Sequence, residues 1–210
     1  MLKKIYLSAL SLILILALIY IFLSTVGIKT NKFNNLLNEK VSEINPKITL
    51  KLNDVNFKLD PTNFEFQAQT DDPIVAINNK EIELELIKFD LNIFEYLKDN
   101  NPVSKLSIVS KENNIKKFTD FINEYDFNLT RNLILKQIKK GKLKIFSDIT
   151  FDEKNPNKMK YSIEGYVKDA KFKFFNQPEI ENIKFDFTLG QNIINLKKIE
   201  LSIDKILFRS

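Results

Sequence analysis

One apolar run near the N-terminus constrains this chain more than any other feature. From Ile5 to Ile28 the sequence contains no charged residue, and only serine, threonine and glycine interrupt its apolar side chains. A helix rises about 1.5 Å per residue, so about 20 residues cross a hydrocarbon core of about 30 Å. The run is long enough to do so, and no face of it is polar. We therefore expect a transmembrane helix rather than a helix of a globular core.

A cleaved signal peptide is the alternative to an anchor. The apolar part of a signal peptide usually spans about 7–15 residues and ends in a small-x-small cleavage site. The run in this chain is longer, and Ser24–Gly27 offers small residues without an Ala-x-Ala site. The sequence therefore predicts an uncleaved anchor at residues 1–28, held in the inner membrane through residues 5–28, and an extracytoplasmic β-rich domain at residues 29–210.

The charges around the run indicate its orientation. Lys3 and Lys4 lie in a very short tail before it and oppose translocation of that tail, although Lys29 and Lys32 follow the run. We expect a single pass with the N-terminus in the cytoplasm and the bulk of the chain outside. The richness in Lys, Asn, Ile and Phe is typical of an AT-rich bacterial genome, so the expected location is a bacterial inner membrane with the domain in the periplasm.

The remainder reads mainly as β-strands. An amphipathic helix is predicted at residues 31–44, after which apolar residues recur with period two. This alternation slips in phase at Asn53-Asp54 and again at Ile87, where a bulge or a turn restores the facing. A helical period returns with Ile115, Phe118 and Ile122, and a second helical segment is expected to end at Gly141. The predicted strands lie at residues 48–52, 55–59, 64–68, 74–77, 82–91, 106–109, 143–151, 161–174, 183–189 and 199–203.

This pattern predicts a mainly β fold with a few helices (α+β), built as an antiparallel, curved meander. The strands have one apolar and one polar face, and the chain contains 18 Phe. Two arrangements remain open: the apolar faces meet in a closed sandwich, or one concave apolar face stays partly open as a groove for acyl chains. In the second arrangement the candidate lipid-facing side chains are Phe57, Phe66, Leu84, Phe172 and Phe185.

The sequence offers little for chemistry. It contains no His, no Cys and only four Gly, which removes the usual general base, the thiol nucleophile and any glycine-rich phosphate loop. Glu81, Glu83 and Glu85 alternate with apolar residues and form the solvent face of a strand. The lysines of residues 136–144 and the net charge of +5 indicate solvated surfaces, not a nucleic-acid site. We expect no enzyme activity, no catalytic residue, no metal, no cofactor and no nucleic-acid partner.

The order of elements resembles the N-terminus of AsmA-like proteins of the bacterial inner membrane. Those proteins begin with one transmembrane helix, followed by a short helix and a strand pair. The matching segments here are the anchor, Thr30–Leu37 with a stop near Pro46, Ile48–Leu52, Val55–Pro61, Pro73–Val75 and Ile82–Leu91. The resemblance covers about half of the chain. It implies a periplasmic β-groove, a role in envelope lipid transport or homeostasis, and no enzymatic activity.

Family members are usually several times longer than 210 residues, so the chain is expected to be a truncated piece, a gene fragment or a minimal relative. Two functions follow as hypotheses. The first is a lipid-handling envelope protein that binds phospholipid acyl chains in an apolar β-groove. The second is a structural or adaptor module, tethered at the membrane, that binds another envelope protein. Lipid carried by the purified domain would distinguish them.

Overall fold

The computed structural model describes residues 2–32, 34–63, 65–98, 103–152, 158–173, 177–203 and 206–209. Its helices are α1 (Leu2–Thr25), α2 (Asn34–Ile44), α3 (Ile93–Tyr96), α4 (Ile115–Tyr125) and α5 (Leu129–Leu135). Its strands are β1 (Ile28–Thr30), β2 (Ile48–Lys51), β3 (Val55–Asp60), β4 (Glu65–Asp71), β5 (Ile74–Ile77), β6 (Lys80–Asn92), β7 (Val103–Ser110), β8 (Asn113–Asn114), β9 (Ile138–Phe151), β10 (Met159–Phe172), β11 (Ile180–Gly190), β12 (Ile193–Ile203) and β13 (Ile206–Arg209).

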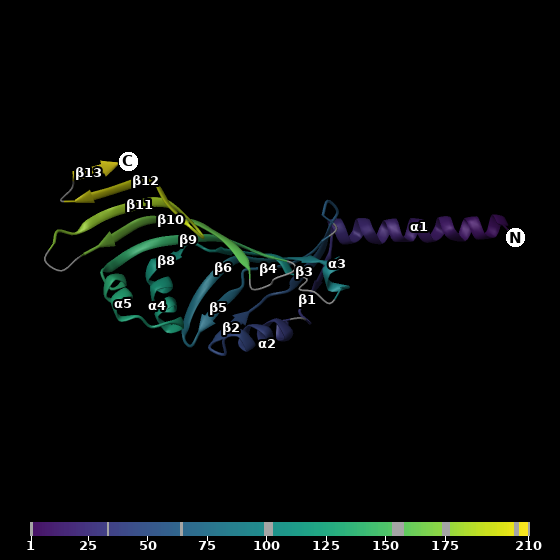
Figure 1. Cartoon of the computed structure of the whole chain (residues 1–210), viewed down its shortest axis with the longest axis horizontal. Coiled ribbons are helices and arrows are strands. Elements are labelled where there is room, and N and C mark those ends of the chain that lie inside the picture. Colours follow the sequence, from purple (N-terminus) through teal and green to yellow (C-terminus); the bar gives the residue numbers. More distant parts are fainter. Residues whose placement is uncertain are drawn as a thin grey trace.

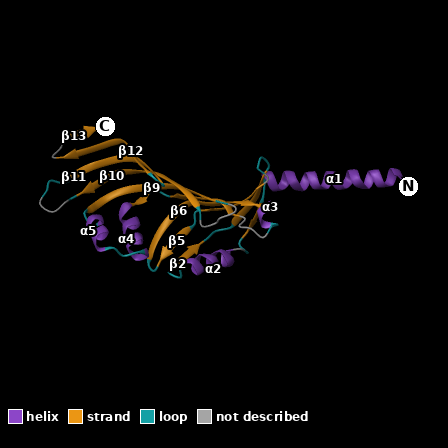
Figure 2. Ribbon diagram, in the orientation of Figure 1, coloured by secondary structure: helices purple, strands orange, loops and turns teal. Residues whose placement is uncertain are grey.

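The strands form one open antiparallel sheet. Its order is β1-β3-β4-β6-β7-β9-β10-β11-β12-β13, with β5 on β6, β2 on β5 and β8 on β9. The sheet arches, and α2, α4 and α5 lie together on one side of it (Figures 1 and 2). The prediction of a mainly β, antiparallel, curved fold is confirmed. Because the sheet is single and does not close, the sandwich alternative is wrong.

The first predicted phase slip is a change of strand rather than a bulge. β2 pairs with β5, whereas β3 pairs with β1 and β4, so the expected pairing of these two consecutive strands is wrong. The side-chain amide of Asn34 donates hydrogen bonds to the carbonyls of Leu52 and Asn53 and so holds the link between them. The second slip was predicted at Ile87, and the β6–β7 register does shift nearby, between Leu84 and Leu86, just before the predicted position.

Gly141 does not end a helix, contrary to the sequence prediction. α5 ends at Leu135, and Gly141 lies inside β9 with a φ of 143°. A Cβ atom at this position would meet the Cβ of Ala170 at 2.8 Å. The glycine is therefore needed for a close crossing of β9 and β10, which a pattern of local residues does not reveal.

The core is small and lies where α4 crosses the sheet. Phe118 of α4 packs with Ile82, Leu84 and Ile87 of β6, and apolar residues of β5, β7 and β9 surround this cluster. Ile122, which shares the helical period with Phe118, is 40% exposed. An ion pair between Lys117 Nζ and Glu83 Oε1, 2.7 Å apart, also joins α4 to β6.

α1 stands apart from this core. It contains a span of 20 residues, Tyr6–Thr25, that is long and apolar enough to cross a membrane, and none of that span is buried in the domain. This excludes a core helix and agrees with either an anchor or a signal sequence. β1 starts at Ile28, which is the last residue of the predicted anchor and already pairs with Phe57.

The junction between α1 and the sheet is close-packed. Gly27 has a φ of 74°, and a Cβ atom there would meet the carbonyl oxygen of Phe57 at 2.5 Å. Only glycine fits such a contact in this conformation. The apolar helix is thus connected to the sheet edge without a flexible linker.

Candidate functional site: an open apolar sheet face

A row of apolar side chains crosses the sheet from the membrane helix outward. Directly paired residues on neighbouring antiparallel strands point to the same face. The row consists of consecutive cross-strand partners from β1 to β10: Ile28, Phe57, Ala68, Phe89, Leu106, Ile149 and Tyr161. It contains no charged residue. The core cluster under α4 includes Phe89 and Leu106, so the row lies on the helix-bearing, concave face.

Beyond α4 the same face continues without a covering layer. Ile145 of β9 packs against the core and pairs with Gly165, which pairs with Phe187, which in turn pairs with Leu196. We define the open apolar face as this uncovered continuation, formed by Tyr161, Ile163, Phe185, Phe187, Leu189, Ile194, Leu196, Leu201, Ile206 and Phe208. In the described part of the chain α4 packs on β5, β6, β8 and β9, and no helix packs extensively on β11–β13.

Exposure along the open apolar face rises toward the last strands. Phe185, Phe187 and Leu189 of β11 are half-buried, while Ile194 of β12 is 81% exposed and Phe208 of β13 is 49% exposed. Large exposed apolar patches on soluble proteins usually mark a surface that contacts lipid or protein. The face is therefore a candidate binding surface.

The opposite face of the same strands carries the charges. Lys184 pairs with Glu200, and Lys198 with Asp186 at 2.6 Å. Lys171 binds both Glu179 and Glu181, and hydrogen bonds to these two carboxylates raise the pKa of Lys171 to about 12. The convex face of these strands is therefore charged and solvated, whereas the concave face is apolar.

The five candidate lipid-facing residues occupy different environments. Phe57, Phe66, Phe172 and Phe185 are half-buried, on β3, β4, β10 and β11 respectively. Leu84 is 5% exposed and packs in the core against Phe118, so it lies beneath α4 and away from the open apolar face.

The sequence reasoning missed the most exposed members of the face, Ile194, Leu196, Ile206 and Phe208. Their alternation was present, but Lys197-Lys198 breaks the period of β12, and Lys198 adopts a φ of 53° at that irregularity. A search for alternation on both sides of a two-residue interruption would have found them.

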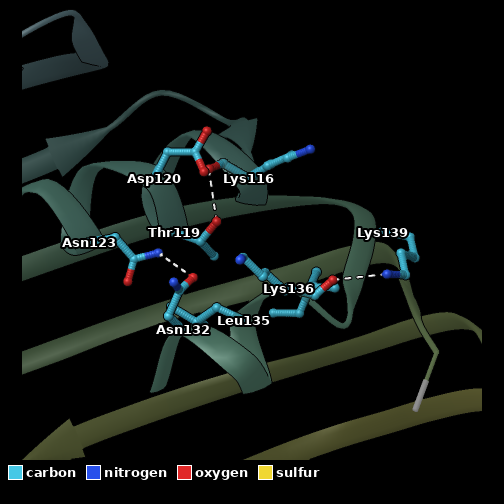
Figure 3. A pocket seen from close by; sticks show the side chains of 9 residues that line it. Lys116, Thr119, Asp120, Asn123, Asn132, Leu135, Lys136 and Lys139 are labelled. Carbon is cyan, nitrogen blue, oxygen red and sulfur yellow. Dashed lines mark hydrogen bonds between the residues drawn. The ribbon is translucent and has the colours of Figure 1, made fainter. Parts of the chain in front are cut away.

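A separate cleft lies between α4, α5 and the start of β9 (Figure 3). Its volume is about 270 Å³, and it is lined by Lys116, Thr119, Asp120, Asn123, Asn132, Leu135, Lys136, Ile138 and Lys139. Asn123 Nδ2 donates to Asn132 Oδ1 at 3.2 Å, and Lys139 Nζ donates to the carbonyl of Lys136 at 2.9 Å. Three lysines and one aspartate line the cleft, so it is cationic.

Among the described residues, no group of three or more His, Cys, Asp or Glu side chains is placed to hold a metal ion. Asp and Glu are the only such residues in this sequence. Their close neighbours are lysines, as in the Glu112 cluster with Lys142 and Lys168, where hydrogen bonds from Lys142 and Tyr166 lower the pKa of Glu112.

Comparison with known proteins adds little. No protein-family model matches the chain. An alignment 132 positions long, which covers 58% of the chain, shows 32% identity to the DNA-directed RNA polymerase subunit beta' of Oedogonium cardiacum and spans only 6% of that subunit. No solved structure matches the chain. So small a share of the polymerase subunit shows no common family, and function has to be argued from the sheet itself.

Proposed function

We propose that this chain is a membrane-anchored, non-enzymatic protein of the bacterial envelope that holds lipid acyl chains on the concave face of its sheet. The observation that carries the proposal is the unbroken apolar row that starts at Ile28, directly after α1, and leads to the open apolar face. An acyl chain leaving the bilayer beside α1 would meet apolar surface at once. The resemblance to AsmA-like proteins supports the same role.

The size of the sheet limits what it can hold. Ten strands lie along its main path, so nine spacings of about 4.8 Å give a width of about 43 Å. One leaflet of a bilayer core is about 15 Å thick, half of about 30 Å. The face is therefore wide enough to shield one or two acyl chains, and too short to join two membranes by itself.

The proposed topology places the N-terminus in the cytoplasm and the sheet in the periplasm. Lys3 and Lys4 support this orientation, because a short cationic tail resists translocation. We expect the full chain to stay in membranes through an alkaline wash. Leu14→Arg should prevent this, since a charge at mid-membrane costs about 2.5–3.5 kcal/mol on insertion scales. A mature N-terminus near residues 25–30 would contradict an uncleaved anchor.

Site-specific photocrosslinking tests the lipid-binding face. A photoreactive amino acid replaces Phe185 on the apolar face or, as the matched control, the neighbouring Lys184 on the charged face of the same strand. In membranes we expect phospholipid adducts at position 185 and few at position 184. Equal labelling at both positions, or none at position 185 in the folded protein, would refute acyl-chain binding.

Chain length gives a second measurement on the full chain in detergent. Each buried CH₂ group contributes about 0.8 kcal/mol, or about fourfold in affinity. Fluorescent fatty acids should therefore bind more tightly as their chains lengthen. Affinity that is independent of length would favour the adaptor alternative.

A further inference from the structure

The short helix α3 turns two large apolar side chains outward. Phe94 is 61% exposed, and Leu97, directly after the helix, is 73% exposed. Because they stand three residues apart, they lie on one side of the helical turn. Glu95, between them in sequence, is buried. A buried carboxylate beside two exposed apolar groups is the reverse of the usual arrangement on a solvated surface.

Hydrogen bonds at both ends of α3 hold this orientation. Asn92 Oδ1, directly before the helix, accepts hydrogen bonds from the backbone N–H groups of Phe94 at 3.0 Å and Glu95 at 3.3 Å. Lys98 Nζ lies 2.6 Å from Glu95 Oε1, and the backbone N–H of Lys98 donates to the carbonyl of Glu95. The turn is therefore fixed, and with it the outward position of Phe94 and Leu97.

The strand register places α3 at the end of the sheet from which α1 leaves. Ile28, three residues after α1, pairs with Phe57, and β3 runs antiparallel from there back toward α1. At the end of β3, Asp60 pairs with Glu65, which pairs with Asn92, the residue before α3. In Figure 1 α3 lies level with the C-terminal end of α1 along the long axis of the molecule. The three strand spacings from β1 to β6, of about 4.8 Å each, separate the two helices sideways by about 14 Å.

A bilayer that holds α1 would reach α3. The 20 residues of the span Tyr6–Thr25 cover a hydrocarbon core of about 30 Å, so the polar interface, about 5–8 Å thick, begins near Thr25. An average helix tilt of about 20° changes the depth of a group about 14 Å away by about 5 Å, which is no more than this thickness. Phe94 and Leu97 therefore fall within the interface, where aromatic side chains are favoured.

We propose that Phe94 and Leu97 insert into the interface of the bilayer that holds α1 and form a second membrane contact. This inference rests on the proposed function, because it requires α1 to be an anchor. The occupant of this apolar surface is lipid, since α1 itself brings the lipid surface to the level of α3. A short apolar turn of this kind binds at the boundary between headgroups and acyl chains without crossing the membrane.

The second contact sets the position of the concave face against the leaflet. Leu59, Phe66 and Leu91 are direct cross-strand partners near the α3 end of the sheet. Each lies two residues beyond a member of the apolar row of Phe57, Ala68 and Phe89, so they share its face. α1 adjoins this end of the sheet at β1, and α3 adjoins it after β6. With both in the membrane, an acyl chain enters the concave face between them.

Single tryptophans test this contact, because the sequence contains no Trp. Phe94→Trp or Leu97→Trp is made in the full chain, which is reconstituted into phosphatidylethanolamine and phosphatidylglycerol vesicles that contain phospholipid brominated in the upper part of its acyl chains. The controls Phe127→Trp and Leu129→Trp match the test positions in residue type, and these side chains are 65% and 64% exposed. They lie at the start of α5, at the end of the molecule away from α1 (Figure 1).

We expect bromination to reduce the emission at positions 94 and 97 by about half or more and to leave the controls unchanged. Circular dichroism verifies the fold of each variant. The proposal is overturned if neither test position is quenched in the folded chain, or if the controls are quenched equally. Removal of the chain from membranes by an alkaline wash would overturn the proposed anchor as well. Phospholipid adducts at position 185 without quenching at positions 94 and 97 would overturn this second contact alone.

Discussion

The packing of Phe118 beneath the sheet gives the sharpest test of how α4 is held. Phe118 is 8% exposed and contacts the Ile82, Leu84 and Ile87 cluster. Phe118→Ala removes roughly 150 Å² of buried apolar surface, which at about 25 cal/mol per Å² is worth about 4 kcal/mol. This value lies within the range of about 3–5 kcal/mol observed for such truncations. We therefore expect a large fall in the free energy of unfolding.

Ile122 provides the matched control within the same helix. It is 40% exposed and lies outside the buried cluster, and alanine has the higher helix propensity. Ile122→Ala should therefore change stability by less than about 0.5 kcal/mol. Urea denaturation of the detergent-solubilised chain, followed by circular dichroism, measures both variants. A loss below about 1 kcal/mol for Phe118→Ala, or equal losses for both variants, would refute the proposed docking of α4.

Two further predictions concern a strand crossing and a salt bridge. A Cβ atom at Gly165 would lie 2.3 Å from the carbonyl oxygen of Lys144, so Gly165→Ala should lower the free energy of unfolding by about 1–3 kcal/mol, measured by thermal unfolding. A Cβ atom at Gly190 would have no atom nearer than 4.0 Å, so the control Gly190→Ala should be nearly neutral. Equal effects of the two substitutions would contradict this β9–β10 contact. The hydrogen bond and charge of Lys117 hold the pKa of Glu83 below its ordinary value, so this group stabilises the fold above about pH 4.3, and that stabilisation is lost as the pH falls through the lowered pKa. Melting curves from pH 7 to pH 3 should show a steeper loss of stability in the wild type than in Glu83→Gln, with Glu164→Gln as the control. A parallel loss in the wild type and Glu83→Gln would show that the Lys117–Glu83 pair contributes nothing.

Much of the secondary structure could be predicted because it depends on local patterns. The apolar run to Ile28 fixes a helix of membrane-spanning length, and period-two alternation identifies strands without knowledge of their neighbours. The predicted strands at residues 183–189 and 199–203 lie within β11 and β12, which pair as neighbours. The helical spacing of Ile115, Phe118 and Ile122 likewise predicted α4.

The candidate site depended on relations between strands that a single sequence does not contain. Alternation shows that Leu84 and Phe185 are both inward-facing, but not that α4 covers only the first of them. Similarly, Gly141 resembles a helix end until its contact with Ala170 is known.

The sequence by itself determined an apolar helix followed by strands with one apolar and one polar face, because these features follow from residue type and spacing. Only the tertiary structure decided that the sheet stays open, that α4 covers its middle strands, and that no helix packs extensively on β11–β13 in the described part of the chain. These features depend on which distant segments meet, and the same alternating strands satisfy local geometry equally well in a closed sandwich or in an open arch.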